Sequence, residues 1–314
     1  MLIVTRGTVE PKERPYPVVT IGNFDGHHRG HQALLQIVVE TARRRHGTAM
    51  VLTFDPHPVK ILAPHVDLKF LTSQDEKLTR FEAAGIDEAV MLAFTSELSA
   101  MTPEQFVDRV LVQQLHTAEL FVGEHFAFGK GRAGRIADLV RFGERHGFTV
   151  HPVAPVTFDG TVVSSTKIRQ LVQAGEMGQA ASLLDRPYAL TGKVIQGRGQ
   201  GREMGWPTAN IPVPEGRVLP PDGVYAARAL HDQGADDAVV YIGTRPTFGA
   251  GERLLEVNLL DQPRELYGRE LTVQFIERLR GDRTFASPAE LSAQIARDVE
   301  RARTSLRRPM EGRR

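Results

Sequence analysis

Two histidines three residues apart are the clearest candidates for chemistry in this sequence. His28 and His31 stand in the segment GNFDGHHRGH, between the apolar run PVVTI and a helical pattern. Side chains three apart on a first helical turn face the same side, and the helix start adds unpaired N–H groups and partial positive charge. Two imidazoles there can stabilise charge growing on an α-phosphate under attack, and Gly30 lets phosphates approach the backbone. The alternative is a histidine-rich surface turn.

A second cationic segment fits the same chemistry. A nucleotidyl transferase must hold the pyrophosphate that leaves, and Ser164, Thr166 and Arg169 place hydroxyls and a cation at a predicted helix start. On its own, this segment is equally consistent with an N-cap followed by a surface arginine. The sequence contains no G-x-x-x-x-G-K-[ST] motif, which excludes a P-loop enzyme.

Different residues in the C-terminal half indicate a site for magnesium and phosphate. Thr208 and Asn210 follow a glycine-rich stretch that includes Gly201, and their side-chain oxygens are hard ligands suited to Mg²⁺. Glu256 lies on a predicted strand whose alternation puts it on one face with Asn258. Its carboxylate can accept the proton of a hydroxyl that attacks a γ-phosphate. The alternatives are a β-turn with polar edges and a solvated strand glutamate.

Alternating strand and helix patterns must position the residues of the first half. Strands are predicted over 17–24, 48–54, 118–123 and 148–153, and helices over 31–45, 73–84, 102–115 and 135–146. This alternation predicts a doubly wound parallel sheet of the α/β class. Two short helices, over 164–173 and 176–184, close this half of the chain.

The pattern changes after Asp185-Arg186-Pro187. Short strands broken by Gly and Pro occupy 188–275 and predict a small antiparallel β-barrel or sandwich, which a helix over 287–303 follows. We therefore expect one domain over 1–186, a second over 187–305, and a basic tail over 306–314.

Composition narrows the class of protein. The chain has 314 residues and a net charge of +1, so no basic field suggests nucleic acid as a partner. It has no Cys, which excludes disulfides, zinc–thiolate sites and thiol catalysis. No apolar run is long enough for a membrane span or a signal peptide. These features lead us to expect a cytoplasmic protein that does not bind nucleic acid or span a membrane, and they leave the oligomeric state open.

The N-terminal half resembles the FAD synthetase module of the bacterial bifunctional riboflavin kinase/FAD synthetases. The resemblance lies in TIGNFDGHHRGH, TFDPHP, VGEHFAFGKGRAG and VSSTKIR. It implies that ATP adenylylates FMN to FAD at this module. The position of the glycine-rich basic loop 129–134 next to a strand end favours a loop that covers phosphate, with a flexible surface loop as the alternative. The implied ATP-binding residues are Gly22, Asn23, Phe24, Asp25, His28, Gly30, His31, Ser164, Thr166 and Arg169, and the implied flavin-binding residues are Phe54, Pro56, His57, Pro58 and Phe128.

The C-terminal half resembles the riboflavin kinase module of the same family, through about residue 303. The resemblance lies in GKVIQGRGQGREMGWPTANI, DGVYAA, IGTRPTFG, LEVNLLD, LYGRELTVQF and RGDRTF. It implies that ATP phosphorylates riboflavin to FMN here, with Thr208 and Asn210 on Mg-ATP beside Gly201. Glu256 is the implied general base, and Arg280 is the implied flavin-side residue.

Two positions depart from the pattern of the family. His125 stands where the family usually has Asp or Asn, and Tyr241 stands where it often has Asn. His125 motivates one alternative, an enzyme in which only the kinase is active and the N-terminal half is a scaffold. A second alternative is a non-catalytic sensor that binds a flavin or nucleotide, which the intact candidate groups at both sites argue against.

Overall fold

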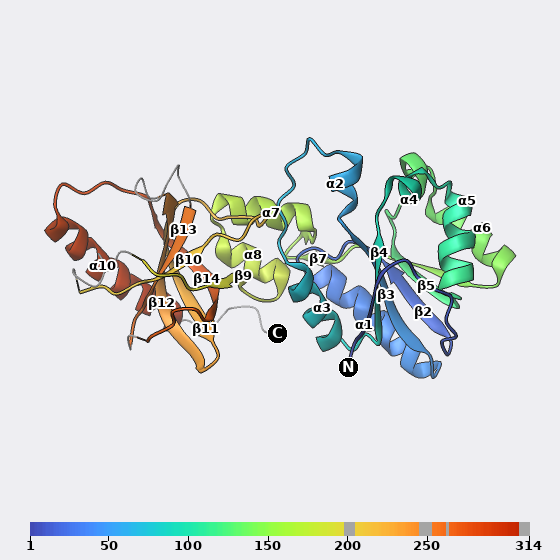
Figure 1. The fold of residues 1–314 in the computed structure, drawn as a ribbon, viewed down its shortest axis with the longest axis horizontal. Helices are drawn as coiled ribbons and strands as arrows, with labels where there is room; N and C mark the ends of the chain where they lie inside the picture. The colour runs from blue at the N-terminus through green and yellow to red at the C-terminus, as the bar shows by residue number, and fades with distance from the viewer. Residues whose placement is uncertain (198–204, 245–252, 262–263, 308–314) are drawn as a thin grey trace. The chain divides into compact units, whose positions relative to one another are not determined.

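The computed structural model describes residues 1–197, 205–244, 253–261 and 264–307. It divides into two compact units, Met1–Ser164 and Ser165–Arg314 (Figure 1). Within the described residues, no helix is both long and apolar enough to cross a membrane.

The first unit is built on a six-stranded parallel sheet with the order β1-β4-β3-β2-β5-β6. The chain leaves β2 through α1 toward β3 on one side, and β5 pairs with the other side of β2. The strand order therefore reverses at β2, and in open parallel sheets ligands bind beyond the carboxyl ends of the strands at such a point. The strands are β1 (Ile3–Gly7), β2 (Pro17–Ile21), β3 (Thr48–Asp55), β4 (Glu88–Ala93), β5 (Glu119–Gly123) and β6 (Thr149–Val153).

Helices cover both faces of this sheet, as Figure 1 shows. Alternation along β2 sends Val18 toward the core cluster with α1 and α3, and Val19 toward the cluster with α5, η1 and α6. Burial on both faces explains why the central strands β2 to β5 are largely apolar, whereas the edge strands β1 and β6 are more polar and more exposed. The other elements of the unit are α1 (Arg29–Arg44), α2 (Pro58–Leu62), α3 (Gln74–Ala83), α4 (Ser96–Ala100), α5 (Pro103–Phe106), the π-helix η1 (Val107–Gln114), η2 (Lys130–Arg132), α6 (Ile136–His146), β7 (Thr157–Phe158) and β8 (Thr161–Val162).

Two buried carboxylates stabilise the amino edge of the parallel sheet. Glu88 pairs with Arg14 at 2.7 Å, and the side chains of the two are 1% and 3% exposed. Glu119 accepts hydrogen bonds from Tyr16 at 2.9 Å and from Arg45 at 3.1 Å. The hydrogen bond from Arg14 holds the pKa of Glu88 below its usual value. The charged carboxylates therefore contribute stability to the first unit at neutral pH.

The second unit is a curled antiparallel sheet of six strands with the order β10-β13-β12-β11-β14-β9. A bridge between Ile195 and Asn210 joins the chain just after β9 to β10, which brings the two edges of the sheet together. Helix α10 packs on one face of the sheet. The elements are α7 (Ser165–Ala174), α8 (Met177–Leu184), β9 (Tyr188–Lys193), β10 (Ala209–Pro212), β11 (Gly223–His231), β12 (Gly234–Thr244), β13 (Arg253–Leu259), β14 (Glu270–Gly281) and α10 (Pro288–Arg307).

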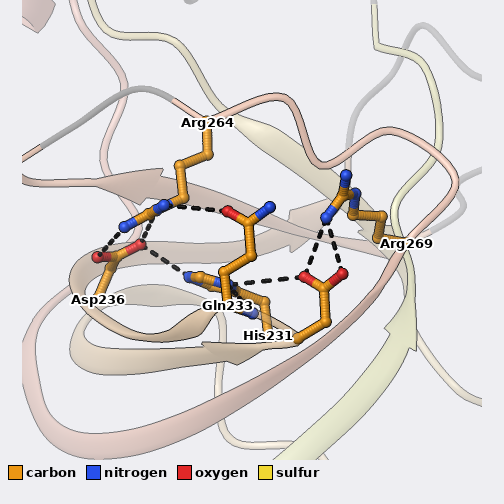
Figure 2. A network of polar contacts seen from close by, with 6 residues as sticks. His231, Gln233, Asp236, Arg264 and Arg269 are labelled. Atoms are coloured by element: carbon orange, nitrogen blue, oxygen red, sulfur yellow. Dashed lines mark hydrogen bonds and ion pairs between the residues drawn. The ribbon is translucent and has the colours of Figure 1, made fainter.

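A polar network that the sequence did not suggest closes the β11–β12 hairpin (Figure 2). His231 Nε2 lies 2.9 Å from Asp236, and His231 Nδ1 accepts the Gln233 N–H at 3.1 Å. Arg264, which precedes β14, donates to Asp236 at 2.6 Å and to the Gln233 side chain at 3.1 Å. The network joins the hairpin tip to the segment before β14, so we assign it to stability.

The predicted fold class is confirmed, and most predicted elements are present. The sequence analysis missed β1 and β4, although EAVMLA at β4 is a buried apolar run. The predicted helix 102–115 is a short α-helix that continues as a π-helix. Helices α7 and α8 belong to the second compact unit, since α8 packs on β14 and β9. The boundary at 186 stays a prediction, and residues 308–314 of the expected tail lie outside the described part.

Replacing Glu88 with Gln should destabilise the first unit, because Arg14 would be left buried without its counter-charge. We expect the free energy of unfolding at pH 7 to fall by about 3 kcal/mol. A carboxyl with a lowered pKa stabilises the folded state above its unfolded pKa, so the difference from the parent should shrink below about pH 4.3. Urea unfolding followed by circular dichroism measures both quantities.

Two controls accompany this test. Glu97 pairs with Arg109 on the surface, where the side chains are 74% and 57% exposed, so Glu97→Gln should cost less than about 1 kcal/mol. Trp206 is the single Trp and lies in the second unit, so its fluorescence transition should not move. Equal losses in Glu88→Gln and Glu97→Gln would contradict the assigned role.

Candidate active sites

The loop after β2 is fixed by one buried carboxylate. Asp25, 3% exposed, accepts hydrogen bonds from the Leu71 N–H at 3.0 Å and from the Thr72 N–H at 3.1 Å. The Gly26 N–H donates to Thr72 Oγ1 at 3.0 Å. Phe24 and His27 have φ of 51° and 42°, a left-handed conformation that costs energy outside glycine. Asp25 thus holds a strained loop in place at the switch point of the sheet.

The two histidines predicted as catalytic come together at the start of α1. His28 is the N-cap residue, and its Nδ1 accepts the His31 N–H at 3.3 Å. The two rings are stacked, with centroids 3.6 Å apart and planes 17° apart. Because Nδ1 of His28 is an acceptor, the neutral ring carries its proton on Nε2 and can donate from there. The arrangement offers imidazole donors and a helix N-terminus on one side, which suits an anion.

Glycines make room for the rings of this site. A Cβ on Gly30 would lie 3.2 Å from His28 Nδ1, and a Cβ on Gly22 would lie 3.1 Å from the Phe24 ring. Gly30 therefore lets the His28 ring lie against the helix start, in addition to its predicted role of admitting phosphate. Asn23, the remaining predicted residue of the loop, has a buried Oδ1 with no hydrogen-bond partner among the described residues.

Lys77 on α3 is a buried cation that the sequence analysis missed. The residue is 6% exposed, and burial lowers the pKa of its ammonium group, while Asp25 and Asp55 act to raise it. Asp55 ends β3, so both carboxylates belong to loops at the carboxyl edge of the sheet. The burial of this lysine cannot be predicted from the helical pattern of 73–84, because a charged residue in an amphipathic helix is normally exposed to solvent.

The predicted flavin-side segment after β3 lies at the same edge. Phe54 packs against Phe94, with ring centroids 5.5 Å apart. His57 is the N-cap of α2, where its Nδ1 accepts the Val59 N–H at 3.2 Å, and Pro58 opens the helix after Pro56. Proline at the first helical position and a capping side chain explain why so short a helix forms here. These side chains remain predicted flavin contacts.

Phe128 lies in the core instead of at an open surface. The residue is 6% exposed, and its ring centroid is 5.9 Å from that of Phe106. A Cβ on Gly134 would come within 2.7 Å of its ring. The glycine-rich loop that follows is exposed over residues 130–133, and the Lys130 N–H ties it to the Met101 carbonyl at 2.7 Å. The predicted contact of Phe128 with flavin stays a prediction.

The segment predicted to hold pyrophosphate forms the start of α7. Ser164 precedes the helix and ends the first unit, whereas Thr166 and Arg169 lie on the helix in the second unit. Thr166 is exposed, and Ser164 and Arg169 are half-buried. Their approach to His28 and His31 stays a prediction.

Predicted residues of the second site share one transverse row on the antiparallel sheet. Glu256 on β13 lies directly opposite Asn210 on β10 and directly opposite Tyr241 on β12. The row continues through Val224 to Arg280 on β14. Directly opposed residues of antiparallel strands point to the same face, with Cβ atoms about 5 Å apart. The structure thus brings together Asn210 and Glu256, as the sequence analysis required.

Asn210 has the environment expected of a metal or phosphate ligand. The residue is 5% exposed, and its Oδ1 is buried with no hydrogen-bond partner among the described residues. A Cβ on Gly197 would lie 2.1 Å from Asn210 Nδ2, so only glycine fits there. Thr208 stands two residues earlier, and Asn258 anchors this turn by donating to the Pro207 carbonyl at 2.8 Å. Asn258 is a positioning residue that the sequence analysis noted only for its face.

Arg280 is held at the far end of the row. Its Nε donates to Asp298 of α10 at 2.9 Å, and its guanidinium carbon lies 5.6 Å from the centroid of the Phe285 ring. Asp298 is 1% exposed, so this ion pair is anchored in the helix interface. The predicted Gly201 lies outside the described residues.

The fold and these groups define a two-part transferase, with an HxGH nucleotidyltransferase domain followed by a curled antiparallel domain that carries a carboxylate and an amide. Residues 10–167 match the FAD synthetase family, and residues 184–306 match the riboflavin kinase family. The chain belongs to the family of bifunctional riboflavin kinase/FMN adenylyltransferases.

Relatives match over nearly the whole chain. The bifunctional riboflavin kinase/FMN adenylyltransferase of Escherichia coli K12 is 40% identical over 91% of each chain. That of Pseudomonas fluorescens is 39% identical over 91% of this chain and 92% of its own. A crystal structure described as a macrolide-efflux protein from Streptococcus pneumoniae superposes with a TM-score of 0.86 and 28% identity, over 96% of this chain and 99% of that one.

Gly30→Ala should impair the first site without unfolding the protein, because the new Cβ would press on the His28 ring. We expect the rate of FAD formation from FMN to fall by about tenfold, which corresponds to about 1.4 kcal/mol in the barrier. Gly178→Ala in α8 is the matched control, since a Cβ at Gly178 would have no atom within 4 Å and the φ of this residue is not left-handed. Unchanged FAD formation in Gly30→Ala would contradict this account of the glycine.

Proposed function

We propose that this protein phosphorylates riboflavin to FMN and then adenylylates FMN to FAD, using one ATP at each of two separate sites. The observation that carries the proposal is that the candidate residues of each family-matched domain lie next to one another. His28 and His31 stack at the helix start of the first domain, and Glu256 lies opposite Asn210 in the second.

In the kinase step, the 5′-hydroxyl oxygen of riboflavin attacks the γ-phosphorus of ATP. The new O–P bond forms as the bond from the γ-phosphorus to the β–γ bridging oxygen breaks, and ADP leaves. Glu256 accepts the hydroxyl proton as general base. The half-buried position of Glu256 beside Asn210 supports this role, because the base must lie where the phosphate is held.

We also propose that Mg²⁺ binds at Thr208 and Asn210 together with the phosphates of ATP. The residues fit such an ion, since Asn210 Oδ1 is buried without a partner among the described residues and the Thr208 hydroxyl adds a second hard oxygen. When bound, Mg²⁺ would neutralise phosphate charge. The protein itself contributes the fixed amide, whose position is set by the ladder between β10 and β13.

In the adenylyl transfer, a phosphate oxygen of FMN attacks the α-phosphorus of ATP, and pyrophosphate leaves. The attacking oxygen is already ionised at neutral pH, so no general base is required. His28 and His31, with the N–H groups at the start of α1, stabilise the negative charge on the α-phosphate. Ser164, Thr166 and Arg169 hold the leaving pyrophosphate in this proposal.

Two variants should separate the activities. Glu256→Gln should lower FMN formation by about 10²-fold or more, because it removes the base, and should leave conversion of FMN to FAD intact. The combined change His28→Ala and His31→Ala should do the reverse. Chromatography of products from riboflavin or FMN with ATP and Mg²⁺ measures both. Loss of both activities in either folded variant would exclude the two-site proposal.

Asn210 gives a test of the magnesium site. Asn210→Ala should lower FMN formation and raise the Mg²⁺ concentration that gives half-maximal rate, because a hard oxygen ligand is lost. Asn210→Asp is the matched control, since it keeps a ligand oxygen of similar reach. An unchanged Mg²⁺ dependence in Asn210→Ala would remove Asn210 from the proposed site. Conversion of FMN to FAD should be unaffected in both variants.

One observation, the residue at position 125, favours the alternative in which only the kinase is active. His125 is exposed in the turn after β5, where the family usually has a smaller polar residue. Normal FMN formation without any FAD in the parent protein would favour that alternative.

We further propose that the enzyme acts in the cytoplasm on small molecules, with support from its use of ATP and the absence of Cys.

A further inference from the structure

Tyr241 is the polar member of the transverse row that neither the family pattern nor the proposed chemistry uses. It lies directly opposite Glu256 in the strand register, on the same face of the sheet. A Cβ on Gly243 would lie 2.1 Å from the Tyr241 hydroxyl oxygen. The phenol ring therefore extends along its own strand over Gly243, which must lack a side chain to admit it.

The hydroxyl of Tyr241 reaches the connection that follows β14. It donates to Asp282 Oδ1 at 3.2 Å, and the same oxygen accepts the Arg283 N–H at 2.8 Å. Asp282 is the first residue after β14. One oxygen of its carboxylate therefore both stabilises the turn at Asp282 and Arg283 and binds the Tyr241 hydroxyl of β12. The connection over 282–287 is thereby joined to the strand next to Glu256.

The same connection is also tied to α10 at both of its ends. Arg283, next to Asp282, donates to Glu290 at 2.8 Å, and the Ala286 N–H at the other end donates to the same carboxylate at 3.1 Å. The guanidinium carbons of Arg280 and Arg283 lie 5.6 and 5.3 Å from the centroid of the Phe285 ring. An aromatic ring and planar guanidinium groups are the side chains that stack on a flat, polycyclic substrate. The Tyr241 tie thus controls where these planar groups stand relative to the row.

The phenol acts as a donor throughout the working pH range. Burial raises the pKa of Tyr241 to about 12, and the carboxylates of Asp282, Glu256 and Asp222 add to this shift. A protonated hydroxyl does not compete with Glu256 as a base. Its hydrogen bond goes to Asp282, which directs its effect to the connection.

We propose that Tyr241 is a positioning residue of the kinase reaction, whose hydroxyl fixes the 282–287 connection beside Glu256 and so sets the affinity for riboflavin. This inference rests on the proposed function, because the proposed function supplies riboflavin as the substrate that the connection contacts. It concerns binding of the flat ring system, and not the transfer of phosphate itself.

The test is a double-mutant cycle of Tyr241→Phe and Asp282→Ala, read by steady-state kinetics of FMN formation. Each single variant should raise the KM for riboflavin by about three- to tenfold, as the loss of one hydrogen bond predicts, with kcat within about twofold. The double variant should match Asp282→Ala alone, because that change already removes the only hydrogen bond that Tyr241→Phe removes. Asp282→Asn keeps an acceptor oxygen and should leave KM near the parent value.

Conversion of FMN to FAD in the same proteins is the internal control and should be unchanged. A KM for riboflavin in Tyr241→Phe equal to that of the parent would overturn the inference, as would additive effects in the double variant. A fall in kcat or thermal stability with no change in KM would show a purely structural role and would also overturn it. If the parent protein makes no FMN, the proposed function itself fails. If the parent makes FMN and Tyr241→Phe keeps the KM of the parent, only the present inference fails.

Discussion

Strand register is the constraint on which the kinase site depends. Glu256, Asn210 and Tyr241 come from three different strands, and they share a face only because β10, β13 and β12 pair as they do. A slip of one residue in β13 would send Glu256 to the opposite face and replace it with an apolar neighbour. The register is secured by the apolar alternation of β13, in which Leu255 and Val257 are buried. Core packing thus determines the position of the carboxylate that we propose as the general base.

The first site depends on the same physics in a different form. A parallel sheet places all its carboxyl ends at one edge, and the order reversal at β2 leaves the GNFDGHHRGH loop there. Sheet geometry alone does not fix a loop, however, and this one contains left-handed residues that are costly without support. Asp25 supplies that support through backbone donors of Leu71 and Thr72. It therefore acts first as the anchor of the loop.

Sequence reasoning predicted what periodicity and motif spacing encode, and little of what long-range packing decides. The pairing of His28 with His31 was expected from helical spacing, and it forms although His28 is the extended N-cap residue and only His31 lies on the helix. The shared face of Glu256 and Asn258 follows from strand alternation. The anchoring role of Asp25 did not follow, because its backbone donors lie 46 and 47 positions further along the chain. The burial of Lys77 did not follow either, because it depends on packing against other elements. Strand β4 was missed because a short apolar run does not distinguish strand from helix. Strand β1, with the sequence IVTRG, was missed because this edge strand is largely exposed and has no apolar run.

The two sites handle the same anion in two ways, and the residues account for the difference. Adenylyl transfer needs charge stabilisation at the α-phosphate but no base, because the attacking phosphate is already ionised. Two imidazoles and a helix start supply donors for it. Phosphorylation of a hydroxyl needs a base, and a carboxylate repels the phosphate that it serves. A cation bound at Asn210 would offset that repulsion. Tyr241, which lies opposite Glu256, stays protonated and neutral and therefore adds no repulsion of its own. The demand for a base thus explains why we propose a carboxylate together with metal-binding oxygens at the second site, whereas imidazoles are enough in the proposed reaction at the first.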